Sequence, residues 1–423
     1  MSPRPRALVV LTGSELVRGD RADANGAFLG RELTRLGLEP ARLVVVGDDP
    51  AELEAAIREG LAGDVLVLSG GLGPTHDDRT VETLARVAGR PLVVSGRLRG
   101  EIEAVSRGIA EWLGRPYGDF EAGVRKQASV PEGGVALGLA GTAPAVLLEH
   151  DRGVAVALPG PPSELQRLWP RVVAHDAFAR VSARAEPPEH AVLRFFGPSE
   201  SAVARALEEF GGEGGGLEVT VCAHDLEIRV DLFAREPDRA RAVRLAQALR
   251  ERFGAELFAE DERPVAGLVL ELGRAQGLTL ATAESCTGGL VAARLTDVPG
   301  SSDVVLGGIV AYSDEVKERQ LGVAKALLRK HGAVSAEVAA AMAAGVRATL
   351  GADTAVAVTG VAGPGGGTPA KPVGLVFTSV ETPDGGSTDR FLVPGDREAI
   401  RARSTALALH CLRRRLSRAA TNA

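Results

Sequence analysis

The chain has 423 residues, of which 45% are hydrophobic and 25% are charged, so it is long enough for two or three globular domains. Its formal net charge of −6 argues against broad nucleic-acid binding, which needs a basic surface. Three separated cysteines, Cys222, Cys286 and Cys411, show no metal-ligand spacing and favour a reducing, cytoplasmic setting. No apolar run suits a signal peptide or a membrane span, so we expect no membrane partner.

Residues 1–175 alternate strand-like and helix-like patterns. Strands are predicted at Ala7–Leu11, Leu43–Val46, Val65–Leu68, Ala145–Leu148 and Val154–Leu158, the last two as a hairpin, and helices at Asn25–Leu36, Ala51–Leu61 and after Pro162. This alternation predicts a parallel sheet with right-handed crossovers. Polar and glycine-rich loops follow the strands, at the edge where open α/β sheets place their ligands.

Residues 176–260 form a middle segment that begins with a polar, proline-containing stretch, Val181–His190, which we interpret as a linker. The elements predicted after it are Ala191–Phe196 (strand), Glu200–Phe210 (helix), Leu217–Cys222 and Glu227–Phe233 (strands) and Asp238–Phe253 (helix). That order predicts a small split βαββα module. It carries no catalytic cluster, which favours a spacer or a dimerisation module.

Residues 261–423 again mix helices with strands. Helices are predicted at Val265–Ala275, Leu290–Thr296, Asp314–Leu321, Ser335–Leu350 and Arg397–Leu412, and strands at Leu278–Ala283, Val304–Tyr312, Thr354–Thr359 and Val373–Val380. The whole chain is therefore predicted to be α/β, with an N-terminal parallel-sheet domain, a small α+β middle module and a C-terminal α/β domain.

Two polar segments in the last third follow apolar strands. In Ala283–Gly289, which reads AESCTGG, a hydroxyl beside a helix N-terminus can orient a nucleophile, hold an anion or simply cap the helix. In Tyr312–Lys317, which reads YSDEVK, a partly buried lysine of lowered pKa could activate a serine, whereas a surface lysine would be solvated. These residues alone leave the alternatives unresolved.

Two more segments contribute weaker signals. Thr359–Gly367 reads TGVAGPGGG, so its backbone N–H groups can approach a ligand closely, although flexible glycine loops are common. Pro394–Arg397 reads PGDR, and the planar guanidinium of Arg397 could bind a phosphate or lie at the surface.

Taken in order, and with the KPVG stretch Lys371–Gly374, these segments resemble the nicotinamide mononucleotide deamidase family, the C-terminal domain of the CinA proteins, over about Arg263–Leu412. The resemblance implies hydrolysis of nicotinamide mononucleotide to nicotinate mononucleotide and ammonia, without a cofactor. The implied catalytic residues are Ser285 as nucleophile, Lys317 as base and Tyr312, and the implied substrate-binding residues are Thr287, Ser302, Thr359, Gly360 and Arg397. Cys286 is a rival nucleophile, since a thiolate is intrinsically stronger, but no histidine lies near it in sequence.

A second constellation, Ser69–Asp78, reads SGGLGPTHDD and follows a predicted strand. Its glycines would let backbone amides surround a phosphate, and clustered carboxylates could hold a divalent cation that bridges phosphates. The candidate phosphate-binding residues are Gly70, Gly71, Gly73 and Thr75, and the candidate metal ligands are Asp48, Asp77 and Asp78. A helix cap at Thr75 or Asp77 is the alternative.

With Thr12–Glu15, Asp23, Asn25 and Leu158–Leu165, this constellation resembles the N-terminal CinA domain, which is related to the MoaB and MogA molybdopterin-binding proteins, over about Ala7–Val173. The resemblance implies hydrolysis of ADP-ribose to AMP and ribose 5-phosphate, with a divalent metal (Mg²⁺, Mn²⁺ or Co²⁺) and potassium. Departures from the family pattern are Ala24, Gly138 and Ala145, where Thr, Asn and Gly are usual, and His76 within the loop. These departures weaken the prediction of ADP-ribose hydrolysis, whereas the deamidase motifs are intact.

The leading hypothesis is a bifunctional hydrolase that recycles pyridine nucleotides, since nicotinamide mononucleotide and ADP-ribose both arise from NAD. An alternative keeps the deamidase and makes the N-terminal domain a non-catalytic nucleotide- or pterin-binding module. Another, suggested by the name of the family, is a competence or DNA-damage accessory protein that acts through protein contacts. We expect no direct nucleic-acid partner, and the resemblance implies a homodimer.

Overall fold

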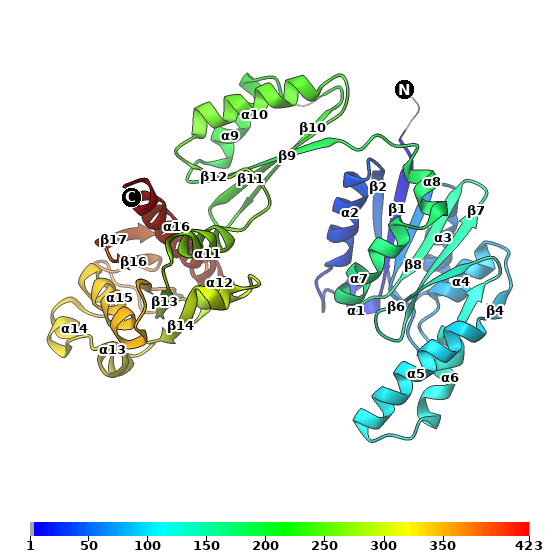
Figure 1. Ribbon diagram of the computed structural model, residues 1–423, viewed down its shortest axis with the longest axis horizontal. Helices are drawn as coiled ribbons and strands as arrows, with labels where there is room; N and C mark the ends of the chain where they lie inside the picture. The colour runs from blue at the N-terminus through cyan, green and yellow to red at the C-terminus, as the bar shows by residue number, and fades with distance from the viewer. Residues whose placement is uncertain (1–3, 213, 423) are drawn as a thin grey trace. The chain divides into compact units, whose positions relative to one another are not determined.

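The computed structural model describes residues 4–212 and 214–422, and the chain separates into two compact units, Met1–Glu189 and His190–Ala423 (Figure 1). The predicted α/β class is confirmed. The middle segment and the C-terminal domain fall within one compact unit. Within the described ranges, no helix combines the length and the apolar character needed to cross a bilayer.

The first unit is built on a six-stranded sheet of order β2-β1-β3-β8-β7-β6. Its strands are β1 (Arg6–Thr12), β2 (Glu39–Val46), β3 (Val65–Ser69), β6 (Val135–Leu139), β7 (Pro144–His150) and β8 (Gly153–Leu158). Strands β2, β1, β3 and β8 pair in parallel, whereas β7 and β6 are antiparallel. The predicted parallel core and the predicted hairpin are both present.

Helices cover both faces of this sheet (Figure 1). One face packs on α2 (Asn25–Arg35), α7 (Pro162–Val173) and α8 (Asp176–Ser182), and the other on α3 (Pro50–Leu61) and α4 (Thr80–Val87). Every residue of β3 is buried, which explains why its sequence, VLVLS, does not alternate. The predicted linker Val181–His190 is shorter than expected, because α8 runs into its start and a strand begins at Glu189.

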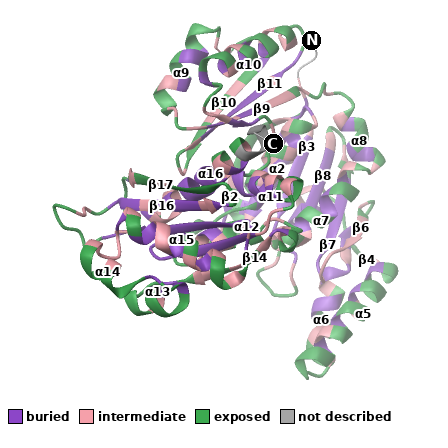
Figure 2. Ribbon diagram, turned by 60° about the vertical axis from the view of Figure 1, so that its left-hand side comes forward, coloured by how far each residue is buried: buried purple, intermediate pink, exposed green. Residues whose placement is uncertain are grey.

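Several elements of the first unit were not predicted. They are α1 (Ser14–Val17), α5 (Gly96–Leu113), α6 (Gly118–Gln127), α8, β6 and the two-stranded sheet of β4 (Leu92–Val94) and β5 (Ser129–Pro131). Figure 1 shows α5 and α6 as an adjacent pair that extends away from the main sheet. Much of this pair is exposed (Figure 2), although α5 buries one stripe, Leu98, Ile102, Ser106 and Ala110.

The middle segment forms a four-stranded sheet of order β10-β11-β9-β12 with two helices. The elements are β9 (Glu189–Phe196), α9 (Glu200–Glu209), β10 (Leu217–His224), β11 (Glu227–Ala234), α10 (Arg239–Phe253) and β12 (Leu257–Ala259). Apolar residues of α9 and α10 pack against β9 and β11 in one core. The βαββα order is as predicted, with the short strand β12 added.

The C-terminal domain contains a five-stranded sheet of order β14-β13-β15-β16-β17. The strands are β13 (Leu280–Glu284), β14 (Val305–Val310), β15 (Thr354–Gly360), β16 (Leu375–Thr382) and β17 (Gly385–Leu392). One face packs on α11 (Val265–Gln276), α12 (Leu290–Thr296) and α16 (Arg397–Asn422), and the other on α13 (Asp314–Leu321), α14 (Lys325–His331) and α15 (Ala336–Leu350). Strand β17 and helix α14 were not predicted, and α16 extends beyond the predicted end at Leu412.

The direction of three strands positions the candidate site. Strands β14, β13 and β15 are parallel, and Glu284 at the end of β13 pairs with Val310 and with Val358. The loops that follow the three strands therefore meet at one edge of the sheet. Those loops are the three segments that sequence analysis singled out around Ser285, Tyr312 and Thr359.

Gly345 allows α15 to pack closely against α13, which carries Lys317. A Cβ atom at Gly345 would lie only 1.9 Å from the carbonyl oxygen of Leu321 at the end of α13. We expect Gly345→Ala to lower the free energy of unfolding by about 2 kcal/mol, because the two helices must separate. Gly267→Ala is the control in the same unit, since its Cβ would meet only Pro264 atoms at 3.6 and 3.8 Å. Chemical denaturation measures both, and equal stability of the two variants would contradict this packing role.

Candidate active site

Ser285 lies in the turn that joins β13 to α12. Its backbone N–H donates to the Val358 carbonyl on β15 at 2.9 Å, and the residue is 9% exposed. Gly288 and Gly289 adopt φ values of +63° and +101°, which glycine permits most readily, and so reverse the chain into α12. The hydroxyl is thereby held at the carboxyl edge of the parallel strands.

The N-terminus of α12 is occupied by Glu284 rather than by Ser285. The buried Glu284 carboxylate accepts hydrogen bonds from the N–H groups of Gly289, Val291 and Ala292, at 2.9, 3.1 and 2.9 Å. These are donors that a helix cap or a bound anion would otherwise take. Ser285 therefore does not cap α12, and its hydroxyl is not used by the start of that helix.

Lys317 is buried on α13, with 1% exposure, so the solvated alternative is wrong for this lysine. Its Nζ lies 3.2 Å from Ser285 Oγ, 2.8 Å from the Ala311 carbonyl oxygen and 3.2 Å from the Tyr312 carbonyl oxygen. Burial lowers the pKa of Lys317, and the charge of Asp314 opposes this shift without overcoming it. In the structure Nζ donates to Ser285 Oγ and to the two carbonyl oxygens; an amine that has lost one proton could keep the two carbonyl bonds and direct its lone pair at the serine hydroxyl.

The rival nucleophile, Cys286, sits in a different environment. It is 5% exposed, and burial raises the pKa of its thiol to about 12, so the thiol stays protonated at neutral pH. The neighbouring Thr287 is fully buried, and its Oγ1 has no hydrogen-bond partner among the described atoms. Of the three side chains in this turn that carry O–H or S–H, Ser285 is the one in contact with a base.

Arg397 and Tyr312 come together at the exposed side of this site. Arg397, the first residue of α16, donates to the Tyr312 hydroxyl at 2.9 Å and to the Gly363 carbonyl oxygen at 2.7 Å. Tyr312 is 59% exposed, so the pair is accessible from solvent. The structure thus places the YSDEVK segment, the glycine loop and the PGDR segment next to one another.

Thr359 and Gly360 end β15 beside the Ser285 turn, and the contacts that the structure shows for them are with neighbouring parts of the same domain. The buried Thr359 hydroxyl donates to the Ala333 carbonyl at 2.8 Å and so fastens the loop between α14 and α15. A Cβ at Gly360 would lie 2.8 Å from the Leu375 carbonyl oxygen, so glycine is needed for the approach of β16.

Ser302 is not brought to the site within one chain. It lies in a short 3₁₀ helix, Ser301–Asp303, that precedes β14. Because β13 and β14 are parallel and Leu280 pairs with Val305, this helix lies at the opposite edge of the sheet from Ser285. The geometry of a single chain gives no support to the predicted contact between Ser302 and the substrate.

Sequence reasoning missed Arg401. Its Nε donates to the Cys286 carbonyl at 3.2 Å and its Nη2 to the Thr287 carbonyl at 2.9 Å, which fastens the Ser285 turn to α16. A signal was present, since residues four apart lie on the same face of a helix and Arg401 follows Arg397 by one turn.

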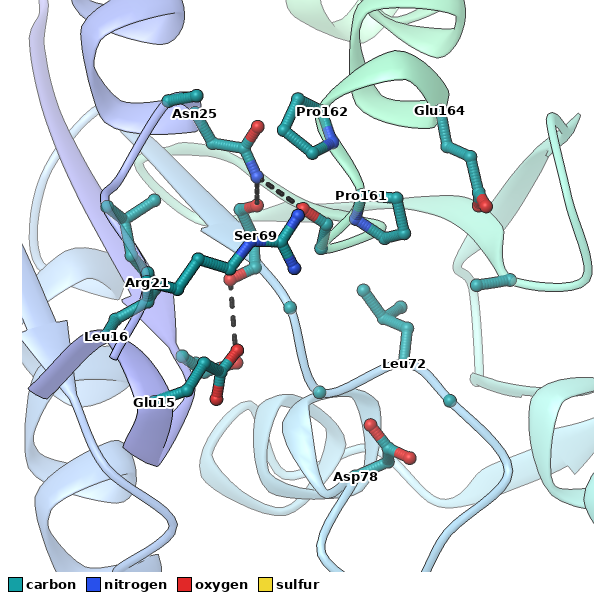
Figure 3. A pocket seen from close by; sticks show the side chains of 18 of the residues that line it. Glu15, Leu16, Arg21, Asn25, Ser69, Leu72, Asp78, Pro161, Pro162 and Glu164 are labelled. Atoms are coloured by element: carbon teal, nitrogen blue, oxygen red, sulfur yellow. Dashed lines mark hydrogen bonds between the residues drawn. The ribbon is translucent and has the colours of Figure 1, made fainter. Parts of the chain in front are cut away.

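The first unit contains a separate pocket of about 320 Å³ at the carboxyl ends of β1 and β3 (Figure 3). Its lining includes Thr12, Glu15, Arg21, Asp23, Asn25, Gly70, Gly71, Gly73, Asp78, Gln127, Thr142, Gly160 and Glu164. Side-chain Cβ atoms at Gly70 and Gly71 would lie 2.5 Å from the Thr12 carbonyl oxygen and 2.3 Å from Thr80 Oγ1. Glycine is therefore required at both positions for the close packing of this loop.

Polar side chains converge on this pocket from three loops. The buried Asn25 donates from Nδ2 to Ser69 Oγ at 2.9 Å and to the Gly160 carbonyl at 2.7 Å, while its Oδ1 has no partner among the described atoms. Figure 3 shows the Arg21 side chain reaching into the pocket. Arg21 and Glu164 were missed by sequence reasoning, and burial raises the pKa of Glu164. The pocket thus offers both a cation and hydrogen-bonding groups.

The predicted metal ligands Asp48, Asp77 and Asp78 share a neighbouring hollow of about 150 Å³. In the described ranges, no three His, Cys, Asp or Glu side chains converge tightly enough to hold an ion. Asp78 instead accepts from the Thr75 N–H at 2.9 Å and from its hydroxyl at 2.5 Å, which also ties Thr75 to the loop. These residues fit a cation that takes further ligands from bound phosphates, and do not fit an all-protein cage.

Comparison with known proteins matches three segments of the chain to described families. Residues 8–178 match the probable molybdopterin binding domain, residues 190–259 the KH domain of damage-inducible protein CinA, and residues 262–416 the CinA C-terminal domain.

A CinA-like protein of Mycolicibacterium paratuberculosis is 45% identical over 433 aligned residues, which cover 97% of this chain and 98% of that protein. One of Mycobacterium tuberculosis is 43% identical, with 99% of each chain covered. The solved competence/damage inducible protein CihA from Agrobacterium tumefaciens is 39% identical, with 37% of this chain and 97% of that chain covered and a TM-score of 0.35.

Proposed function

This chain belongs to the CinA family, and from that premise we propose that its C-terminal domain deamidates nicotinamide mononucleotide to nicotinate mononucleotide and ammonia. The observation that carries the proposal is the distance of 3.2 Å between Ser285 Oγ and the buried Nζ of Lys317. A serine beside a lysine of lowered pKa is an arrangement suited to acyl transfer from an amide.

The reaction proceeds through an acyl-enzyme. Ser285 Oγ attacks the carboxamide carbon as Lys317 Nζ takes the hydroxyl proton. When the tetrahedral intermediate collapses, the C–N bond breaks and Lys317 returns the proton to the leaving nitrogen, which departs as ammonia. Water then attacks the ester, with Lys317 again the base, and releases the nicotinate carboxylate and the serine. No further reactant is needed, since water is the second substrate.

The exposed side of the site supports a phosphorylated pyridine substrate. Arg397 is exposed next to Tyr312, where its guanidinium can bind the 5′-phosphate in a bidentate manner. The exposed ring of Tyr312 is suited to contact the cationic pyridinium ring through its π face. In this arrangement, the carboxamide extends inward to Ser285.

For the N-terminal domain we propose hydrolysis of ADP-ribose to AMP and ribose 5-phosphate. The support is the glycine-lined pocket, with Arg21 reaching into it and Asp48, Asp77 and Asp78 lining the neighbouring hollow. Arg21 and the loop amides would hold the pyrophosphate, and Asn25 would bind an N–H group of the ligand through Oδ1. A divalent cation held by the carboxylates would supply charge stabilisation when bound. The alternative is a non-catalytic module that binds the same class of ligand.

Together the two reactions would make the protein a cytoplasmic, homodimeric hydrolase of pyridine-nucleotide recycling. Potassium would accompany the divalent metal in the N-terminal reaction. The competence or DNA-damage accessory role is the competing proposal, and it requires a specific protein partner and no turnover of either nucleotide.

We expect Ser285→Ala to lower the release of ammonia from nicotinamide mononucleotide by about 1,000-fold or more, because the nucleophile is lost. Cys286→Ala is the matched control in the same turn and should retain most of the activity. Coupled detection of ammonia, with chromatography of nicotinate mononucleotide, measures both variants. Unchanged turnover in Ser285→Ala would sink this assignment of the nucleophile.

The deamidase should require neutral Lys317, so kcat/KM should rise with pH. Because burial lowers the pKa of Lys317, the midpoint of the rise should lie below the ordinary lysine value of 10.5. The sign follows from the base role, since protonation at low pH removes the lone pair that accepts the serine proton. A pH–rate profile checks this, and a rate that is flat or falls as the pH rises would argue against Lys317 as the base.

Purified protein should form AMP from ADP-ribose when Mg²⁺, Mn²⁺ or Co²⁺ is added. We expect Asp78→Asn to reduce this rate by about tenfold or more, because it removes a negative ligand. Asp49→Asn is the control, since Asp49 caps α3 by accepting from the Ala51 N–H and asparagine caps equally well. Binding of ADP-ribose without any turnover by the wild type would instead favour the non-catalytic module.

A further inference from the structure

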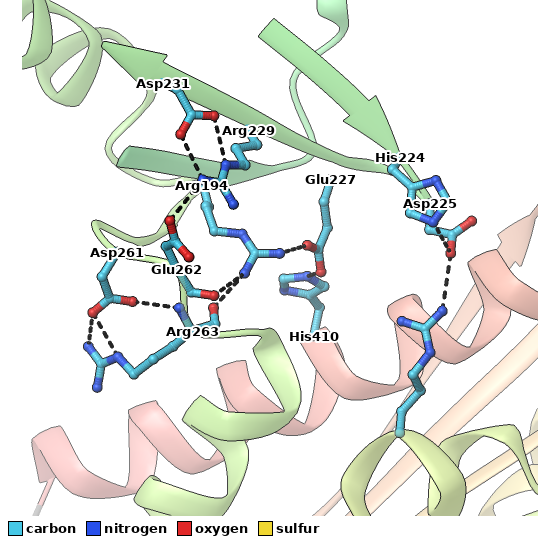
Figure 4. A network of polar contacts seen from close by, with 11 residues as sticks. Arg194, His224, Asp225, Glu227, Arg229, Asp231, Asp261, Glu262, Arg263 and His410 are labelled. Atoms are coloured by element: carbon cyan, nitrogen blue, oxygen red, sulfur yellow. Dashed lines mark hydrogen bonds and ion pairs between the residues drawn. The ribbon is translucent and has the colours of Figure 1, made fainter. Parts of the chain in front are cut away.

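The hairpin between β10 and β11 reaches from the middle module to the C-terminal domain (Figure 4). Its turn residues Asp225 and Leu226 both have positive φ, +48° and +69°. Two-residue hairpins of this kind normally use Asn-Gly or Asp-Gly, because side chains disfavour that backbone region. A non-glycine residue is retained there only when the surrounding contacts hold it, so the contacts of this turn are informative.

The first contact joins the hairpin to α16. Glu227 Oε1 lies 2.9 Å from His410 Nε2, and Arg194 Nη2 donates to Glu227 Oε2 at 2.7 Å. His410 is fully buried and stacks on Phe196, with ring centroids 3.8 Å apart. Burial would raise the pKa of Glu227, but His410 and Arg194 outweigh it and lower that pKa. The Glu227 carboxylate thus connects the module to α16 through its contacts with Arg194 and His410.

The second contact joins the same hairpin to α12. Asp225 Oδ2 lies 3.5 Å from Arg294 Nη2 on α12, and the Asp225 side chain is only 15% exposed. Arg194, the partner of Glu227, also donates to the Arg263 carbonyl at 2.6 Å, where the chain enters the C-terminal domain. The hairpin is therefore held at several points rather than by one surface ion pair.

Both contacted helices are attached to the turn that carries Ser285. Helix α12 starts directly after that turn and is held by Glu284, whereas α16 carries Arg401, which donates to the carbonyls of Cys286 and Thr287. His410 follows Arg401 by nine residues, about 14 Å along a helix that rises about 1.5 Å per residue. The hairpin thus contacts both helices that hold the Ser285 turn, although it does not contact the turn itself.

We propose that the β10–β11 hairpin is a clamp that positions the Ser285 turn, with Glu227 acting through His410 on α16 and Asp225 through Arg294 on α12. These are positioning residues, since neither carboxylate contacts Ser285 or Lys317. The effect of this clamp on the reaction rate rests on the proposed deamidase function. Loss of the clamp lets α16 and α12 shift, and a displacement of about 1 Å can cost a rate factor of about 100.

The test compares Glu227→Gln in the full chain with Glu260→Gln. The first keeps the shape of the side chain and removes the charge between Arg194 and His410. The control makes the same chemical change in the same module, at an exposed pair with Arg250 of α10 (2.7 Å). Amide hydrogen exchange, followed by mass spectrometry, is read over residues 284–296 and 397–405, alongside kcat and KM.

We expect Glu227→Gln to speed exchange in both segments by about threefold or more, and Glu260→Gln to leave it unchanged. In the same variant, kcat should fall by about fivefold with KM little altered, because the nucleophile is misplaced while Arg397 and Tyr312 remain. Should Glu227→Gln prove unstable, Asp225→Asn tests the α12 contact, since asparagine tolerates the positive φ.

Faster exchange confined to the hairpin, with residues 284–296 unchanged, would overturn the clamp. The exchange readout does not depend on catalysis. Wild-type protein without deamidase activity would therefore refute the proposed function while the clamp is still tested by exchange. Conversely, a fully active wild type with unchanged exchange and unchanged kcat in both hairpin variants would refute the clamp alone.

Discussion

The burial of Lys317 against Ser285 is the constraint on which the C-terminal domain depends. An amine taken out of water loses solvation, and here carbonyl oxygens of Ala311 and Tyr312 replace part of it. Such a position exists only if α13 lies close to the sheet. Helix α13 packs against α15 at Gly345, and α15 in turn lies close to the sheet because alanines dominate the core between it and strands β13 and β15.

In the part of the chain that the structure describes, the Ser285 hydroxyl does not hydrogen-bond the backbone of its turn, because other side chains satisfy the backbone groups there. Glu284 satisfies the amides at the start of α12, and Arg401 takes the carbonyls of Cys286 and Thr287. Without Glu284, the nearest hydroxyl would compete for those amides as a cap. The turn is thus fixed from two sides, and the Ser285 hydroxyl lies 3.2 Å from Lys317 Nζ.

The pocket of the first unit is organised in a different way. Its glycines allow the loop to pack closely against Thr12 and Thr80, and Arg21, Asn25 and Glu164 line it from separate parts of the chain. The carboxylates beside it share a hollow without forming a closed set of ligands. The Ser285–Lys317 pair, in contrast, is in direct hydrogen-bond contact within the protein.

The sequence by itself determined the parts whose signal is local. Apolar runs such as Val65–Leu68 and helices such as Leu290–Thr296 follow from residue pattern, and the order of four short motifs pointed to Ser285 and Lys317. The short strands β4 and β5 were missed because three residues are too few to show a period, whereas α5 was missed although it buries Leu98, Ile102, Ser106 and Ala110 at four-residue spacing. Tertiary structure alone decided that Lys317 is buried, that Glu284 and not Ser285 caps α12, and that Ser302 lies at the far edge of the sheet. The physical reason is that burial, the partner of each hydrogen bond and the value of a pKa depend on strands and helices distant in sequence, which a local pattern does not encode.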